Sequence, residues 1–527
     1  MESYTLKPAR YINREWNSVH KEWRGDILKI ALCFPDIYEI GMSHLGMKII
    51  YGILNNEKDV LCERAFAPWS DMEKKMRAEG QALFSLESKR ALKEFDMVGF
   101  SLQYEMNLPD VLNMLDLGGV PVFCNERGDK DPIVIAGGPV CFNPKVMADF
   151  IDAFLIGEAE EAILEVASVV KNGKRNKSSR GEILEELSKI EGVFIPGANG
   201  TKKRIVSDLD NAYFPTAPVV PYIQIVHDRI GIEIMRGCPH RCRFCQACKI
   251  FHPLRFRSVE KILEIAKLSV KNTGYEEVSL LSLSSGDYPH IEELASKLEQ
   301  MFTGTGVRVS LPSLRVRDLG KDKMGKSIKR SGLTFAPEAG NDLLRESLGK
   351  NMKNDDIIQK SNLALNSGWK KVKLYFMIGL PGETDKDLDS IIELSSEIKS
   401  VNLSVSAFIP KPHSGFEKEG METLEKLNFK REYIEARRLE HKRARKLKIT
   451  FHDLKMSAIE AVLSRGDASV GKVIYKAYQK GARLQAWDEF FNYNLWMECF
   501  QGLALDPSDY LRKKDQGARL PWDCIIS

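Results

Sequence analysis

Apolar and polar positions alternate along the first 205 residues in a strand–helix rhythm. Apolar runs typical of buried strands occupy residues 28–35 (LKIALCFP), 95–102 (FDMVGFSL), 131–138 (DPIVIAGG) and 152–157 (DAFLIG). Amphipathic segments such as EAEEAILEVASVV separate these runs. The alternation predicts an α/β domain with a largely parallel sheet over residues 1–205. The polar run at 171–181 (KNGKRNKSSRG) is expected to be an exposed loop.

A proline-rich stretch at 213–221 (YFPTAPVVP) predicts a linker over residues 206–228, after which the alternation restarts. Six further strands are expected at 230–235, 276–283, 307–312, 332–337, 371–380 and 402–410. Strands followed by crossover helices predict a partial (β/α)6 barrel over 229–455, with its active site at the C-terminal strand ends. The Trp-rich residues 456–527 are predicted to form a small, mainly helical region that caps the barrel mouth.

Composition limits the functional classes. The chain has 527 residues, 43% of them hydrophobic and 28% charged, and a formal charge of +4. It can therefore bury several cores, and its bulk charge indicates neither a nucleic-acid nor a membrane partner. The first residues, MESYTLKPARYINREW, lack the apolar core of a signal peptide, and no apolar run is long enough to span a membrane. A cytoplasmic protein with reduced cysteines is expected, which makes disulfides the least favoured use of cysteine.

Four cysteines are concentrated in residues 236–251, RGCPHRCRFCQACKIF, directly after the first predicted barrel strand. A structural zinc site usually combines two short knuckles from separate places, and the sequence offers no second one. Iron–sulfur clusters favour compact cysteine runs of this kind. Cys238, Cys242 and Cys245 would supply three ligands to a four-iron cube and leave one iron free.

The spacing C-x-x-x-C-x-aromatic-C after a first barrel strand resembles the radical S-adenosylmethionine (SAM) superfamily. The resemblance implies that Cys238, Cys242 and Cys245 hold a 4Fe–4S cluster, that SAM chelates the fourth iron, and that Phe244 packs near the adenine. Cys248 departs from the pattern, because the most similar relatives carry Gly at this place. A fourth thiolate would close the open iron, so we interpret Cys248 as a structural residue.

Further candidate SAM contacts follow the later barrel strands. In SSGDY (284–288), Asp287 would accept from the SAM ammonium beside the backbone of Ser284, Ser285 and Gly286. By resemblance, Glu338 in FAPEAG contacts SAM and Arg345 pairs with its carboxylate, whereas Gly379, Pro381 and Gly382 in FMIGLPGET form a turn against it. Lys411 and His413 in IPKPHSGF are expected to face the active site.

The N-terminal part resembles the cobalamin-binding-like domain that precedes the barrel in one large class of radical SAM enzymes. Stretches such as YEIGMSHLG, FSLQYE, IAGGP and IGEAEE carry this resemblance to an uncharacterised family with that fusion. It implies a doubly wound, Rossmann-like sheet that binds its ligand at the strand ends. The candidate contacts are Gly41, Ser43, Gln103, Tyr104, Gly137, Gly138, Pro139, Gly157 and Glu158.

The Asp-x-His-x-x-Gly signature that supplies an axial histidine to cobalt is absent from the sequence. His44 in MSHLG has Asp36 and Gly46 near it, but at the wrong spacing. We therefore predict that cobalamin, if it is bound, has no protein histidine on cobalt.

The predicted function is that of a radical SAM enzyme that reductively cleaves SAM to a 5′-deoxyadenosyl radical. Methyl transfer from cobalamin to an unactivated carbon would be the second step. The expected partners are an electron donor such as flavodoxin or ferredoxin and a substrate that no motif identifies. Two alternatives stay open. One is an RNA methylthiotransferase with a second cluster, for which Cys33, Cys62, Cys124 and Cys141 are available. The other is a non-catalytic, metal-stabilised nucleic-acid-binding protein, suggested by the basic segment 430–448, which we interpret as a solvated outer helix.

Overall fold

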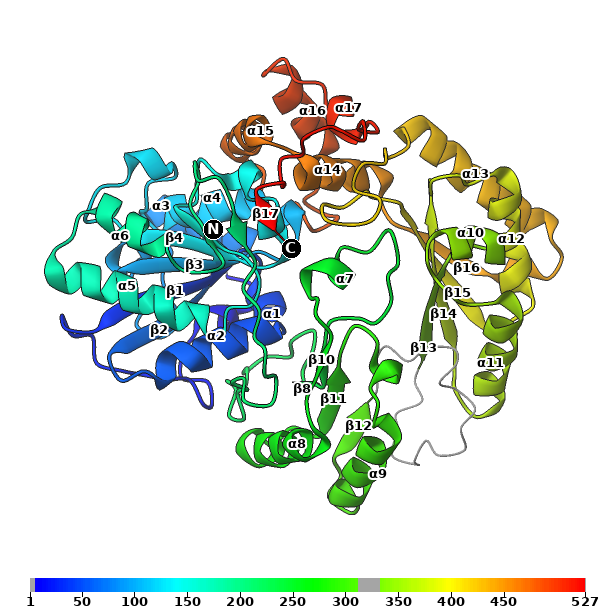
Figure 1. Cartoon of the computed structure of the whole chain (residues 1–527), viewed down its shortest axis with the longest axis horizontal. Helices are drawn as coiled ribbons and strands as arrows, with labels where there is room; N and C mark the ends of the chain where they lie inside the picture. The colour runs from blue at the N-terminus through cyan, green and yellow to red at the C-terminus, as the bar shows by residue number, and fades with distance from the viewer. Residues whose placement is uncertain (1–4, 311–331, 527) are drawn as a thin grey trace.

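The computed structural model describes residues 5–310 and 332–526. Its N-terminal sheet has the strand order β2-β1-β3-β4-β5-β6, parallel except for the antiparallel β5–β6 pair (Figure 1). This is a doubly wound order whose switch point lies between β1 and β3. The strands are β1 (Leu28–Phe34), β2 (Val60–Phe66), β3 (Met97–Ser101), β4 (Ile133–Gly137), β5 (Ala153–Leu155) and β6 (Val193–Phe194).

Each face of this sheet has its own core. One core contains alternate strand residues such as Leu32 and Ile135 together with α2 and α5, and the other contains Cys33 and Val98 together with α3 and α4. Strands that are buried on both faces need near-continuous apolar sequence, which explains why their apolar runs were visible in the sequence. The helices of this domain are α1 (Tyr38–Gly41), α2 (Leu45–Asn56), α3 (Ser70–Glu79), α4 (Leu108–Leu117), α5 (Ala162–Asn176) and α6 (Arg180–Leu187).

The polar run 171–181 is not the loop that its composition predicted. Its first half continues α5, and α6 begins at Arg180. Lys171 and Lys174 extend from the helix to Asp59 and Asp96, with Nζ–carboxylate distances of 2.7 and 2.6 Å. These pairs place polar side chains on the solvent side of a helix whose other face is buried.

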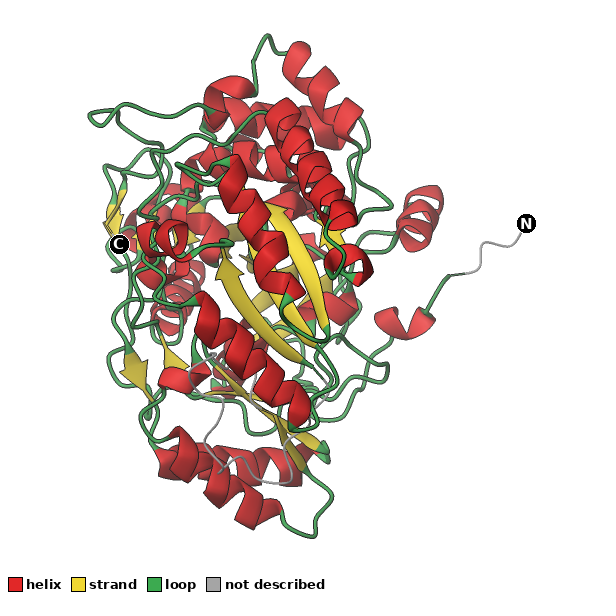
Figure 2. Cartoon of the chain, turned by 90° about the vertical axis from the view of Figure 1, so that its right-hand side faces the viewer, coloured by secondary structure: helices red, strands yellow, loops and turns green. Residues whose placement is uncertain are grey.

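The second half of the chain forms two parallel sheets, of order β8-β11-β12 and β13-β14-β15-β16. All six predicted strands are present, although residues 311–312 of the third lie outside the described residues. Figure 2 shows the helices that cover the outer side of the second sheet. The strands are β8 (Ile230–Glu233), β11 (Glu277–Leu281), β12 (Arg308–Ser310), β13 (Leu333–Glu338), β14 (Val372–Ile378), β15 (Val401–Ala407) and β16 (Lys448–Phe451). The helices are α8 (Val259–Thr273), α9 (Ile291–Phe302), α10 (Asp342–Ser347), α11 (Asn354–Asn366), α12 (Asp385–Ser396) and α13 (Leu424–Glu440).

The C-terminal helices join the two halves, whereas the sequence predicted a cap over the barrel mouth. α14 contributes Ile459 and Val462 to the core of the N-terminal domain, and Ala458 and Ala461 to the core of the second barrel sheet. The last strand, β17 (Ile525–Ile526), pairs with β7 (Thr201–Lys202). No described helix has the length and apolar character needed to cross a membrane. The elements of this region are α14 (Leu454–Arg465), α15 (Ala468–Gln479), α16 (Tyr493–Gln501) and α17 (Ser508–Leu511).

Candidate active site

The cysteine segment leaves the barrel as a closed loop that begins directly after β8. β9 (Met235–Arg236) pairs antiparallel with β10 (Arg255–Phe256), and this short ladder holds the base of the loop together. Gly237 has a φ of +90°, and a Cβ there would lie 2.9 Å from the carbonyl oxygen of Phe251. Only glycine fits at this turn. The short helix α7 (Ala247–Ile250) lies within this loop, and Figure 1 shows it between the two halves of the molecule.

A buried carboxylate from the N-terminal domain fixes the base of this loop. Glu158 lies 2.6 Å from Arg255 Nη2 and 3.1 Å from Arg236 Nη1, and Glu160 lies 2.6 Å from Arg236 Nη2. Burial alone would raise the pKa of Glu158, but the two guanidinium groups outweigh it and hold that pKa below its ordinary value. Glu158 lines the slot over the N-terminal sheet, and its carboxylate also anchors the cysteine loop to the N-terminal domain; its contact with cobalamin stays a prediction.

Two thiols of the loop, Cys245 and Cys248, share a hydrogen bond that shifts their pKa values in opposite directions. The hydrogen bond from the Cys248 thiol is the main reason that the pKa of Cys245 falls to about 6. The same contact, burial and the charges of Cys245, Cys242 and Cys238 raise the pKa of Cys248. Cys248 Sγ also donates to the carbonyl oxygen of Cys245 at 3.0 Å. At neutral pH the geometry therefore favours a thiolate at Cys245 and a protonated thiol at Cys248.

The fit of this loop to a cluster rests on that arrangement. The charges of the other three thiols act on Cys248, so all four side chains share one part of the loop. Across residues 5–310 and 332–526, no three His, Cys, Asp or Glu side chains are arranged to hold a single metal ion. A four-iron cluster makes a different demand, because each thiolate binds a different iron. The grouping of Cys238, Cys242 and Cys245 is compatible with that demand, and both their assignment as cluster ligands and the structural role of Cys248 stay predictions.

The turn after β11 contacts the cysteine loop directly. Asp287 Oδ2 lies 2.7 Å from His240 Nε2 and accepts a 2.6 Å hydrogen bond from Ser284 Oγ. Ser285, Gly286 and Asp287 themselves form a short 3-10 helix. His240 was not among the predicted SAM contacts. Its position between the first two cysteines, in C-P-H-R-C, was the available signal that it would reach a neighbouring strand end.

The ends of the later strands contact the other side of the loop. Glu338 ends β13 with a φ of +71°, and its Oε1 lies 2.8 Å from Lys350 Nζ. Lys350 Nζ lies 5.7 Å from the ring centroid of Phe244, and its positive charge also lowers the pKa of Cys245. Phe244 packs against the small core that includes Phe408. Glu338 and Phe244 are therefore brought together, with Lys350 as a member that the sequence analysis missed.

Three other predicted SAM contacts are engaged in local structure. The guanidinium of Arg345 is fully buried and donates to Asp342, Asn354 and two carbonyl oxygens of its own segment. Gly379 has a φ of +80° and donates from its backbone N–H to Glu383 at 2.8 Å, and Pro381 follows in the same turn. These geometries show how the turns are held, and contact of the three residues with SAM stays a prediction.

An apolar slot of about 340 Å³ lies over the switch point of the N-terminal sheet. Its floor contains Leu32, Gly99 and Ile135 from three strands, and α2 and α5 form its sides. The predicted contacts Gly137, Gly138 and Gly157 line it, as do Gln103 and Pro139. Arg236 and Phe251, at the two ends of the cysteine segment, line it as well.

His44 also lines this slot, at the start of α2. Burial lowers the pKa of its imidazole to about 4, although a hydrogen bond to Gln103 acts in the opposite direction. Its Nδ1 is buried without a hydrogen-bond partner in the described chain. The histidine is thus neutral and packed at the slot wall.

The remaining candidates lie elsewhere. Gly41 and Ser43 line two other cavities beside α2. Lys411 Nζ lies 2.7 Å from Glu105 and 2.8 Å from Glu460, and Tyr104 donates to Glu460 at 2.9 Å. His413 Nε2 lies 3.0 Å from the carbonyl oxygen of Phe142. Tyr104, Lys411 and His413 therefore join the two halves of the molecule, and the expectation that Lys411 and His413 face the active site is not met.

Two family models match this chain. The model described as radical SAM proteins, N-terminal, matches residues 46–196, and the model of the radical SAM superfamily matches residues 232–395. The chain belongs to the radical SAM superfamily, whose members bind a 4Fe–4S cluster and SAM. The resemblance found in the cysteine loop is thereby confirmed.

Individual relatives extend this result over most of the chain. The uncharacterized protein MJ0966 of Methanocaldococcus jannaschii is 31% identical over 462 residues, which are 86% of this chain and 92% of the relative. The threonylcarbamoyladenosine tRNA methylthiotransferase MtaB of Thermotoga maritima is 26% identical over 235 residues, 41% of this chain and 51% of its own length. The solved structure of the radical SAM methyltransferase TsrM from Kitasatospora setae, with cobalamin and a [4Fe-4S] cluster bound, covers 74% of each chain at 11% identity and a TM-score of 0.53. At that identity the likeness shows a shared fold.

Proposed function

We propose that this radical SAM enzyme is a methyltransferase that holds cobalamin in the N-terminal slot and SAM in the barrel. The proposal rests on one observation: Arg236 and Phe251, at the two ends of the cysteine segment, also line the slot. A ligand in the slot would therefore lie beside the cluster loop. TsrM, which shares the fold, is a methyltransferase whose structure contains cobalamin and a cluster.

The slot suits a flat ligand that approaches the backbone closely. A Cβ at Gly138, whose φ is +112°, would lie 2.4 Å from the carbonyl oxygen of Leu102. A Cβ at Gly99 would meet only Leu32 Cδ1, at 3.9 Å, so the absence of a side chain there opens space above β3. Ligands of doubly wound sheets bind at this switch point.

Different residues of this chain would contact different groups of SAM. Asp287 is paired with His240 of the cysteine loop, and Glu338 is paired with Lys350, whose ammonium group lies over the ring of Phe244. Asp287 would accept from the SAM ammonium, with His240 and Ser284 holding its orientation. Phe244 would pack beside the adenine and exclude water. When bound, the cluster and SAM supply a 5′-deoxyadenosyl radical, and cobalamin supplies a methyl group.

The second candidate, a methylthiotransferase, requires a second set of cluster cysteines. Cys33 and Cys141 belong to one core of the N-terminal sheet, Cys62 belongs to the other, and Cys124 lies outside both. Their separation favours the methyltransferase, despite the similarity to MtaB over part of the chain.

Anaerobic purification and reconstitution with iron, sulfide and hydroxocobalamin test the proposal. We expect about four irons and about one corrinoid per chain, and 5′-deoxyadenosine or S-adenosylhomocysteine from SAM under reduction. An iron content of about eight without corrinoid would instead support the methylthiotransferase. Absence of any SAM turnover by cluster-loaded protein would overturn the enzyme assignment.

A further inference from the structure

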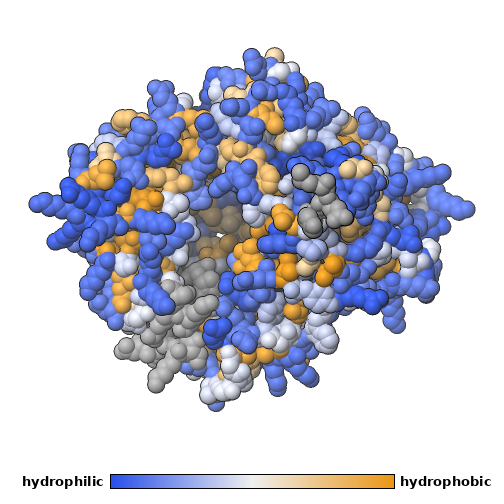
Figure 3. Space-filling view, turned by 180° about the vertical axis from the view of Figure 1, so that it is seen from behind, coloured by the Kyte–Doolittle hydropathy of each residue, from blue (hydrophilic) through white to orange (hydrophobic). Residues whose placement is uncertain are grey.

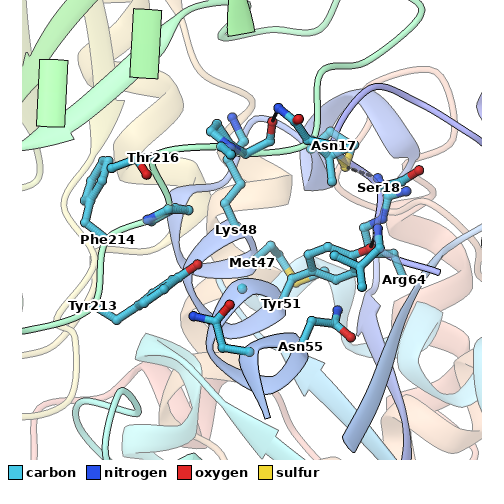
Figure 4. Close-up of a pocket in the computed structure, with 18 of the residues that line it drawn as sticks. Asn17, Ser18, Met47, Lys48, Tyr51, Asn55, Arg64, Tyr213, Phe214 and Thr216 are labelled. Atoms are coloured by element: carbon cyan, nitrogen blue, oxygen red, sulfur yellow. Dashed lines mark hydrogen bonds between the residues drawn. The ribbon is translucent and has the colours of Figure 1, made fainter. Parts of the chain in front are cut away.

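Two cavities beside α2 are separate from the slot. The larger has a volume of about 430 Å³ and the smaller about 260 Å³. They share Lys48 of α2 and the linker residues Phe214, Pro215 and Pro218, and so form one groove between the helix and the linker. Figure 4 shows the larger cavity, with Lys48 and Tyr51 on the helix and Tyr213 and Phe214 on the linker. Figure 3 shows the molecule from behind, with a hollow near its centre.

Among the side chains that line the larger cavity, Lys48 has a charged group that is available to bind a ligand. Asn55 exchanges two hydrogen bonds with the backbone of Cys62, and Arg64 is ion-paired with Glu15 and Glu87. Lys48, in contrast, makes no ion pair or side-chain hydrogen bond with any residue that the structure describes. Burial lowers the pKa of its ammonium group to about 8, although Asp228 acts in the opposite direction. A buried, unpaired cation is costly, and an anionic ligand would relieve that cost.

A histidine and an arginine line the smaller cavity together with Lys48. They are His227 and Arg229, and Arg229 Nη1 is 3.4 Å from Glu277 Oε1. Burial lowers the pKa of His227 first, and the charges of Arg229 and Lys48 lower it further. His227 is therefore a neutral imidazole at pH 7, and Lys48 and Arg229 supply the positive charge. The carboxylates that face them are Asp228 and Glu277, of which Glu277 is shared with Arg229.

The groove lies beside the predicted SAM turn. Gly231 and Leu281, which line the smaller cavity, belong to the face of β8 and β11 opposite to the one packed on α8. Ser282, in the same wall, lies 2.9 Å from Ser285 of the SSGD turn, oxygen to oxygen. Leu45 lines both the smaller cavity and the slot. The groove therefore runs from the SAM turn to the slot that we assign to cobalamin.

We infer that this groove binds the substrate as a small molecule with a carboxylate or phosphate group. Lys48 and Arg229 hold the anionic group, with the neutral imidazole of His227 as a hydrogen-bonding partner, and Tyr51 and Phe214 pack against an apolar or aromatic body. That the ligand is the substrate rests on the proposed function. The binding of an anion in the groove does not depend on the proposed function. The anion site and the proposed function can therefore fail separately.

The test uses phenyl phosphate, benzoate and uncharged phenol as probes on the reconstituted full-length protein, with calorimetry as the readout. Both anions should bind at least about tenfold more tightly than phenol, because a charge-assisted hydrogen bond forms only with them. Lys48→Met should remove about tenfold or more of the anion affinity, and Lys48→Arg should restore part of it. Lys58→Met removes an exposed lysine just after α2 and is the matched control. The comparison of phenyl phosphate with benzoate tells which anion the site prefers.

Chemical labelling in the unaltered protein makes the test independent of variant folding. Trinitrobenzenesulfonate labelling of Lys48, measured by peptide mass spectrometry with Lys58 as the internal reference, should slow severalfold with phenyl phosphate present. Equal labelling with and without the anion, or full anion affinity in a Lys48→Met protein that keeps its iron, would overturn the inference. If the parent protein binds the anions but turns over no SAM, the site stands and the proposed function fails.

Discussion

The cysteine loop and the N-terminal slot face each other, yet the chain builds them in opposite ways. The loop concentrates its chemistry in residues 236–256 of one segment, closed by the β9–β10 ladder. The slot collects residues from four strands of the N-terminal sheet, from α2 and α5 and from the base of the cysteine loop, and much of what defines it is the absence of a side chain, as at Gly99 and Gly138. A site carried by one segment can be recognised from the spacing of its residues in the sequence. A cavity formed by residues from distant segments can be recognised only in the three-dimensional structure.

The largest expected effect concerns the loop. Cys238→Ala, Cys242→Ala and Cys245→Ala should each abolish cluster absorbance and SAM cleavage, because these three thiolates are the proposed protein ligands. Cys248→Ala is the control and should keep most of the iron, since its thiol is protonated and bonded to a backbone carbonyl. Iron analysis and reductive SAM cleavage check the set. Loss of the cluster in Cys248→Ala alone would contradict the three-ligand assignment.

A matched change in the slot should separate the two sites. Gly99→Val places a branched side chain in the space above β3, and its first carbon meets no atom closer than 3.9 Å. Corrinoid uptake should be lost while iron content and SAM cleavage stay at the parent level. Gly181→Val, in an open position of α6, should affect neither. Normal corrinoid uptake by Gly99→Val would show that the slot is not the site.

A smaller effect is expected where the barrel strands meet the loop. Asp287→Asn and Glu338→Gln should each weaken SAM binding by about 1.5–3 kcal/mol, since each removes one charged acceptor. The cluster spectrum should not change, and the exposed Asp356→Asn serves as the charge control. Equilibrium binding of SAM to the reconstituted proteins measures the effect. Parent-like affinity in both variants would leave the strand ends without a role in SAM binding.

The smallest effect concerns His44. Its imidazole is neutral, hydrogen-bonded to Gln103 and packed at the slot wall, and the sequence lacks the Asp-x-His-x-x-Gly signature of an axial ligand. His44→Ala should therefore leave the absorbance spectrum of bound cobalamin unchanged. A shift of that spectrum would identify His44 as an axial ligand and contradict the prediction from the missing signature.

In the N-terminal sheet the sequence predicted β1, β3, β4 and β5, whose runs are mostly apolar, and it missed β2 and the short β6. β2 is buried along its whole length, but it contains Glu63 and Arg64. Arg64 is neutralised by Glu15 and Glu87, which lie 49 and 23 positions away. No local pattern reveals partners at such distances, so a charged segment was not recognised as a strand.

The same limit applies to the candidate site. The cluster cysteines were predicted from the sequence because one loop carries them all. The pairing of His240 with Asp287 and the anchoring of the loop by Glu158 depend on which segments the fold brings together. For Glu158, the sequence predicted a place in the slot wall, but the role of its carboxylate depended on two distant arginines.

The packing of the C-terminal helices on the N-terminal domain has a consequence for biosynthesis. Val473 and Trp496 complete a core whose other members are made near the start of the chain, such as Val111 and Val134. At usual elongation rates the ribosome reaches these residues about 15–60 s after it leaves the N-terminal domain. Until then the face of α4 that packs against α15 has no cover. Successful production of this protein thus depends on what shields that surface during translation. Fragments that end at the linker should stay in solution only when the C-terminal helices are supplied in trans.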